Sequence, residues 1–220
     1  NLFLQKRWDL LNYLCKNNTQ MQFTELHLNA SLLKAIAEER FQTPTQVQEK
    51  AIPPILAKKN VIVSAQTGTG KTAAFALPIL QLLLDRQTPE KKTKRIKSLI
   101  VTPTRELCLQ IEANFKSYAK HTDLTTTAVY GGVSLTPQKE ILKEGVDILI
   151  ATPGRLIDLH KQGAIDLRAI EIFVLDEADL MLDMGFINDV TTIESLCPRK
   201  KQSLLFSARS EDHTSELHSL

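Results

Sequence analysis

Six short apolar runs constrain the fold of this chain more than any other feature of its sequence. They lie at residues 61–64, 99–102, 126–130, 148–151, 172–175 and 203–206. Most are unbroken rather than alternating, which is typical of strands buried on both faces of a parallel sheet. Segments with helical spacing, such as residues 73–84 and 106–119, separate some of them. The sequence therefore predicts an α/β fold, a mostly parallel sheet with helices on both faces, and a ligand site outside the carboxyl ends of the strands.

Two further helices are expected before the first strand. Ser31 is the predicted N-cap of a helix that runs to Arg40. Thr45 is the predicted N-cap of a second helix that runs to about Lys58 and is kinked by Pro53 and Pro54.

Composition excludes several classes of protein. Of the 220 residues, 43% are hydrophobic and 24% are charged, as in a globular domain with a substantial core. The sequence has no run of 18 apolar residues and no secretion-signal pattern, and Cys15, Cys108 and Cys197 form no C-x-x-C pair. These features exclude a membrane span and a disulfide framework, and they predict a cytoplasmic location. We also expect a monomer.

Charge alone does not indicate a nucleic-acid binder. The chain has 27 Lys and Arg against 25 Asp and Glu, a net charge of +2, so any contact with nucleic acid must come from a local patch. Residues 89–97 hold five cations, a run more typical of a solvated loop than of an RNA contact.

Both ends differ from the α/β pattern. We expect a domain at residues 21–208, preceded at 1–20 by a non-native upstream extension. Residues 209–220 resemble a translated DNA-sequencing adapter.

The strongest local motif follows the first predicted strand. It consists of Ala65, Gln66, Thr67, Gly68, Thr69, Gly70, Lys71 and Thr72. A glycine-rich loop between a strand and a helix presents backbone N–H groups to phosphates, a lysine can reach the β- and γ-phosphates, and a threonine hydroxyl can ligate Mg²⁺. Ala65 stands where the general phosphate-loop pattern has glycine, which is the one departure from it.

Two carboxylates follow the fifth predicted strand. Asp176 is expected to hold Mg²⁺, partly through water, and Glu177 is expected to orient and deprotonate the attacking water. An isolated acidic turn is more often a solvated helix start, but the preceding lysine loop favours the catalytic interpretation.

Together, A-Q-T-G-T-G-K-T and D-E-A-D resemble the DEAD-box ATP-dependent RNA helicases, particularly bacterial members, over nearly all of residues 21–208. Residues 41–48 resemble the adenine-recognition motif of that family. The resemblance implies that the Gln48 amide pairs with adenine, that Phe41 packs near the base, and that Thr45 supports the phosphate loop.

The resemblance also implies a path for the RNA sugar–phosphate backbone. Its residues follow the second, third and fourth predicted strands and are Pro103, Thr104, Arg105, Gly131, Gly132, Thr152, Pro153, Gly154 and Arg155. Hydroxyls, helix N-termini and arginines suit phosphates, and none of these residues reads base edges. Ser207 and Ala208 stand where the family has S-A-T, with Arg209 in place of the threonine, and they are expected to couple hydrolysis to strand separation through Asp179.

The implied fold is a RecA-like phosphate-loop NTPase domain, the first of the two such domains of an ATP- and Mg²⁺-dependent RNA helicase. Without the second domain we expect this chain to bind nucleotide and RNA but to hydrolyse ATP only feebly. Two alternatives stay open: another phosphate-loop ATPase, such as a DNA translocase, and an RNA-binding clamp or scaffold that uses ATP without unwinding.

Overall fold

The computed structural model describes residues 21–86 and 95–208 and confirms the predicted parallel sheet. Its strands within these residues are β1 (Val61–Ser64), β2 (Ser98–Val101), β3 (Thr126–Val129), β4 (Ile148–Ala151), β5 (Ile172–Leu175) and β6 (Gln202–Ser207). They are hydrogen-bonded in the order β1-β6-β5-β2-β4-β3, with every pairing parallel. Each predicted run is a strand whose ends differ from the prediction by at most one residue.

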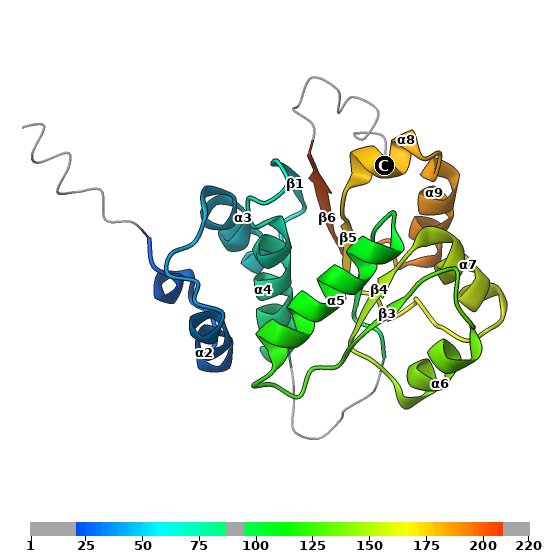
Figure 1. The fold of residues 1–220 in the computed structure, drawn as a ribbon, viewed down its shortest axis with the longest axis horizontal. Coiled ribbons are helices and arrows are strands. Elements are labelled where there is room, and N and C mark those ends of the chain that lie inside the picture. Colours follow the sequence, from blue (N-terminus) through cyan, green and yellow to red (C-terminus); the bar gives the residue numbers. More distant parts are fainter. Residues whose placement is uncertain (1–20, 87–94, 209–220) are drawn as a thin grey trace, which may run out of the picture.

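Helices cover both faces of the sheet, as Figure 1 shows. One face carries α2 (Ala30–Glu38), α3 (Gln46–Leu56), α4 (Lys71–Leu84) and α5 (Arg105–Ala119), with the 3-10 turn η1 (Phe23–Leu26) beside them. The other carries α7 (Pro153–Lys161), α8 (Ala178–Asp183) and α9 (Ile187–Leu196), while α6 (Thr136–Glu144) connects β3 to β4. None of the helices in the described residues is long and apolar enough to cross a membrane.

The unbroken apolar runs reflect a separate core on each face. In β4, Ile148 and Ile150 pack into the first core, whereas Leu149 and Ala151 pack into the second. Because successive side chains of a strand point to opposite faces, every position of β4 is buried.

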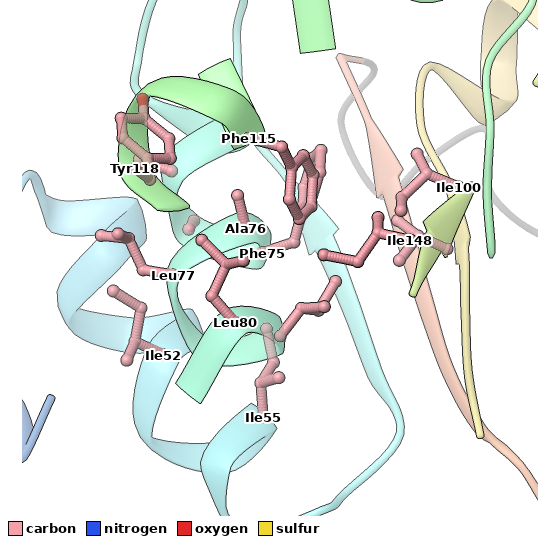
Figure 2. Packing of buried hydrophobic residues seen from close by; sticks show 14 of the residues in the cluster. Ile52, Ile55, Phe75, Ala76, Leu77, Leu80, Ile100, Phe115, Tyr118 and Ile148 are labelled. Atoms are coloured by element: carbon pink, nitrogen blue, oxygen red, sulfur yellow. The ribbon is translucent and has the colours of Figure 1, made fainter. Parts of the chain in front are cut away.

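Helix α4 forms the centre of the first core. All of its side chains from Ala73 to Leu83 are buried, a pattern expected for a helix surrounded by other elements. Figure 2 shows Phe75, Leu77 and Leu80 of α4 among side chains of α3, α5 and the sheet. The start of α4, which carries Lys71, is thereby fixed beside the end of β1.

The helices before β1 differ in detail from the prediction. The N-cap of α2 is Asn29, whose side chain accepts a hydrogen bond of 2.9 Å from the Ser31 backbone N–H, so Ser31 lies inside the helix. Asparagine and serine cap helices about equally well, and here Asn29, two positions before Ser31, supplies the side-chain acceptor. Thr45 does cap α3, but that helix ends at Leu56 rather than Lys58. Lys58 has a φ of 59°, a left-handed conformation that cannot continue a helix.

The carboxyl ends of the strands form one edge of the domain. Ser64 of β1 pairs in register with Ser207 of β6, and Val101 of β2 pairs with both Leu175 of β5 and Ala151 of β4. Because the strands are parallel and end together, the segments that follow them lie side by side. These segments hold nearly all of the residues singled out from the sequence.

Candidate functional site

The glycine-rich loop connects β1 to α4 at this edge. The Ala65 backbone N–H continues the sheet by donating to the Ser207 carbonyl at 3.0 Å. Gly68 and Gly70 have φ of 81° and 87°, a left-handed conformation that favours glycine. A side chain at Gly70 would also meet the Gln48 amide, which would have to shift to make room for it.

Two residues of the 41–48 segment hold the loop from the α3 side. The Thr45 hydroxyl donates to the Thr69 carbonyl at 2.8 Å, and Gln48 Nε2 donates to the Gly70 carbonyl at 3.2 Å. Gln48 Oε1 also accepts from the Thr45 backbone N–H at 2.9 Å, which completes the N-cap of α3. The amide group predicted to read adenine is thus engaged by the phosphate loop and by its own helix.

A buried ion pair joins the loop to the two-carboxylate segment. Lys71 Nζ lies 2.9 Å from Glu177 Oε1, and both side chains are almost fully buried. Glu177 has a φ of 53°, in the left-handed region where residues other than glycine are uncommon. This conformation turns the chain from β5 into α8 and lets the Glu177 side chain meet Lys71.

Asp176 is buried beside this pair, and its Oδ1 has no hydrogen-bond partner. Burial, with a further contribution from the Glu177 charge, raises the pKa of Asp176 to about 7. A buried carboxylate with an unpartnered oxygen is poorly stabilised by protein groups alone. It suits a bound cation.

We expect Asp176→Asn to stabilise the protein without ligands. The pKa of Asp176 in the folded protein lies above its ordinary value of 3.8. As pH rises, Asp176 therefore loses its proton in the unfolded chain before it does so in the folded protein. For this reason the Asp176 carboxyl lowers the free energy of unfolding progressively between about pH 4 and pH 7. The variant should therefore gain more than about 1.4 kcal/mol of unfolding free energy at pH 8, the equivalent of one pKa unit, and little at pH 4. Thermal melts at both pH values, with the exposed Asp158→Asn as control, measure this. Equal gains at the two pH values would contradict it.

Most of the predicted nucleotide residues line one cavity of about 660 Å³, whereas Ala65, Gln66 and Thr69 line a second cavity beside β1 instead. Those that line the first cavity are Phe41, Thr45, Gln48, Thr67, Gly68, Gly70, Lys71, Thr72, Asp176 and Glu177. Sequence reasoning missed the opposite wall, where Gln110, Asn114 and Tyr118 project from α5. No motif marks these residues, because they reach the cavity only through the packing of α5 beside α4.

The predicted RNA path also lies at the carboxyl edge. Its residues follow β2, β4 and β3, which are neighbours in the sheet. Thr104 is the N-cap of α5, and its hydroxyl accepts from the Leu107 backbone N–H at 3.2 Å. Thr152 and Pro153 open α7. Gly131, Gly132 and Gly154 are exposed and have open space where a side chain would be, so a ligand could approach their backbone closely.

The two arginines of the path contact the segment after β3. The Arg105 guanidinium lies 4.9 Å from the centre of the Tyr130 ring. Arg155 Nη2 donates to the Val133 carbonyl at 2.8 Å. The structure thus brings the predicted residues from three strands into one surface.

Ala208, one of the two predicted coupling residues, contacts the predicted partner Asp179. The Ala208 backbone N–H donates to Asp179 Oδ1 at 3.3 Å, and α8 packs against β6. Residues 1–20 and 209–220 lie outside the described residues, so the expectations for these two segments stay predictions.

The cysteines and histidines do not gather into a metal-ligand group anywhere in residues 21–86 and 95–208. Cys108 and Cys197 are buried, and burial raises the pKa of Cys108 to about 12. His121 lies on the surface, where its Nε2 is 3.0 Å from Glu38 Oε1.

Comparison with known proteins identifies relatives over nearly the whole described chain. The ATP-dependent RNA helicase SrmB of Escherichia coli is 47% identical over 193 residues, which are 88% of this chain and 43% of SrmB. The DEAD-box ATP-dependent RNA helicase RhpA of Helicobacter pylori is 47% identical over 84% of this chain and 36% of RhpA. The chain therefore spans less than half the length of either relative.

Solved structures share the fold. The crystal structure of a DEAD box protein from Methanococcus jannaschii superposes with a TM-score of 0.82 at 38% identity, covering 90% of this chain and 53% of that one. The sheet with helices on both faces is thus the RecA-like fold that the sequence predicted. Finally, the family model of the DEAD/DEAH box helicases matches residues 45–216. With these similarities and the geometry of its phosphate loop and D-E-A-D segment, the chain belongs to the DEAD/DEAH box helicase family.

Proposed function

We propose that this domain binds Mg²⁺-ATP in the cavity and the RNA backbone along the carboxyl edge, as one part of an ATP-dependent RNA helicase. The observation that carries the proposal is the buried Lys71–Glu177 pair next to Asp176 and the glycine-rich loop. Side chains suited to binding phosphate, to holding a metal ion and to accepting a proton lie together there, although they come from two distant segments.

Phosphate binding would use groups already in position. The backbone N–H groups of the loop lie at the N-terminus of α4, where the helix dipole favours negative charge. Lys71 is held close to the loop by Glu177 and would exchange this partner for phosphate oxygens. Its charge is then neutralised by the nucleotide rather than by a carboxylate.

The chemistry of the donor set fits Mg²⁺. Hard oxygen ligands suit this ion, and Asp176 supplies an unpartnered buried oxygen in the same cavity as Thr72. When bound, Mg²⁺ would neutralise charge on the phosphates, while Asp176 and Thr72 would hold the ion. Binding would also remove the cost of ionising Asp176.

Hydrolysis would use Glu177 as general base. Once Lys71 has turned to the phosphates, the Glu177 carboxylate is free to accept a proton from the attacking water. A second domain would add an arginine, which in related phosphoryl-transfer enzymes contributes about 10³–10⁵ in rate. Efficient turnover is therefore a property we assign to the two-domain protein.

RNA binding would be independent of base sequence. The surface after β2, β4 and β3 offers hydroxyls, helix N-termini, exposed glycines and two arginines, all of which suit phosphates. The contact between Asp179 and Ala208 would link this surface to the nucleotide. A monomeric state and a cytoplasmic location stay predictions.

Two other functions of the same fold are separated by simple measurements. A DNA translocase would prefer DNA to RNA in binding assays. A clamp or scaffold would bind ATP and RNA together without turnover. The 41–48 segment favours the helicase, because it accompanies the D-E-A-D form in the family that this chain resembles.

Adenine preference tests the nucleotide assignment. Gln48→Glu removes the amide donor, leaves an acceptor and places a charge near the Gly70 carbonyl, so ATP binding should weaken by roughly 1–3 kcal/mol, about 5- to 150-fold. Competition against a fluorescent ATP analogue measures this, with Gln46→Glu as the matched control on the exposed side of α3. If GTP competes with the unmutated protein as well as ATP does, the adenine assignment is wrong.

A further inference from the structure

Helix α6 buries one side chain only, and that side chain is the amide of Gln138. Gln138 is 8% exposed, while Thr136, Pro137 and Glu140 around it are exposed. A buried polar group normally costs stability unless it is hydrogen-bonded, so its contacts identify its role.

The Gln138 amide bridges two segments of the RNA path. Its Nε2 donates to the Tyr130 carbonyl at 3.1 Å, directly before the Gly131–Gly132 pair. Its Oε1 accepts from Arg155 Nη1 at 3.0 Å. Donor and acceptor of one amide thus join the turn after β3 to the arginine at the start of α7.

These contacts fix the direction of the Arg155 guanidinium. A second hydrogen bond, from Nη2 to the Val133 carbonyl at 2.8 Å, holds the other arm. A guanidinium has five N–H donors. The two bonds leave further donors on Nη1 and Nη2 for a phosphate, while Nε is buried without a partner. Because these bonds already hold the Arg155 side chain in one conformation, little conformational entropy has to be lost when RNA binds.

Gln138 also acts on the second arginine of the path. Gln138 holds the backbone carbonyl of Tyr130, and the ring of the same Tyr130 contacts the Arg105 guanidinium. One amide is thereby connected to Arg155 directly and to Arg105 through the backbone of Tyr130.

We propose that Gln138 is a positioning residue for RNA binding, which orders both arginines before RNA arrives. The proposal rests on the proposed function of this surface. It adds a residue that contacts no RNA phosphate itself and lies outside the motifs that carry the family resemblance.

The test uses the 220-residue chain, fluorescent single-stranded RNA and Gln138→Met. Methionine has nearly the same shape but lacks the amide, so packing is kept while both hydrogen bonds are lost. RNA affinity should fall about three- to tenfold, the equivalent of about one net hydrogen bond. Binding of the fluorescent ATP analogue should be unchanged, which shows that the domain is folded. Gln162→Met, an exposed glutamine at the end of α7, is the matched control and should bind RNA normally.

A double-mutant cycle separates positioning from a general structural effect. In a chain that already carries Arg105→Ala and Arg155→Ala, Gln138→Met should have little further effect on RNA affinity, because the side chains that it positions are gone. An undiminished effect in that background, or normal RNA binding by Gln138→Met alone, would overturn the proposal.

A second variant decides the matter if Gln138→Met does not fold. Gln138→Glu keeps an acceptor for Arg155, but the new carboxylate neutralises the charge of the Arg155 guanidinium. The slope of log RNA affinity against log salt concentration should therefore flatten by about 0.7, the contribution of one phosphate contact. An unchanged slope would overturn the proposal. Failure of the unmutated chain to bind RNA would instead refute the RNA-binding function itself, which distinguishes the two failures.

Discussion

Lys71→Ala should reduce Mg²⁺-ATP affinity by about 10- to 100-fold, because it removes a charged hydrogen-bond donor worth about 1.5–3 kcal/mol. It should also lower stability by about 3 kcal/mol, because it leaves the buried Glu177 carboxylate without its partner next to Asp176. Titration with a fluorescent ATP analogue measures the first effect, and a denaturant melt measures the second.

The double variant Lys71→Ala, Glu177→Gln separates these two effects. Removing the unpaired charge should restore most of the lost stability, whereas nucleotide affinity should stay well below that of the unmutated protein, because the lysine is still missing. Lys50→Ala, at an exposed position of α3, is the matched lysine control. Full nucleotide affinity in folded Lys71→Ala protein would exclude Lys71 from phosphate binding.

Glu177→Gln should abolish hydrolysis and leave binding intact. The glutamine oxygen can still accept from Lys71 Nζ, so the geometry of the pair is preserved, while the base that would take the proton from water is lost. General-base catalysis contributes about 10²–10⁴ in rate, and we expect a loss of that size in a two-domain protein. Single-turnover hydrolysis measures the loss.

ATP affinity should stay equal or increase in this variant, because a negative charge near the phosphates has been removed. Glu194→Gln, which changes an ion pair with Lys201 on the other face of the sheet, is the control. Normal turnover by Glu177→Gln would exclude this residue from the mechanism.

The fold was largely predictable because both faces of the sheet are buried. Continuous apolar runs at residues 148–151 and 172–175 have no polar face, and such strands need helices on both sides. The order of the strands was not predictable in this way. Nothing in the sequence of β6 indicates that it lies between β1 and β5, because strand order depends on long-range packing.

The site was predictable where a motif carries the chemistry. The sequence predicted the glycine-rich loop, Asp176 and Glu177 as parts of one site, and these two carboxylates line one cavity with Thr67, Gly68, Gly70, Lys71 and Thr72 of the loop. The partners of each side chain were not predictable. Gln48 bonds Gly70, and Gln138 bonds Arg155, so each contact joins residues that are distant in sequence. Both contacts use a neutral side-chain amide, which no charge pattern in the sequence marks.

If this domain belongs to an ATP-dependent RNA helicase as proposed, RNA should stimulate ATP turnover at this site, which a chimera can measure. Residues 21–208 would replace the aligned part of Escherichia coli SrmB, with SrmB itself as the positive control. ATP turnover is then measured with and without single-stranded RNA. Turnover should rise several-fold with RNA and be lost in Glu177→Gln. ATP and RNA binding without turnover, or turnover that RNA does not change, would contradict the proposal.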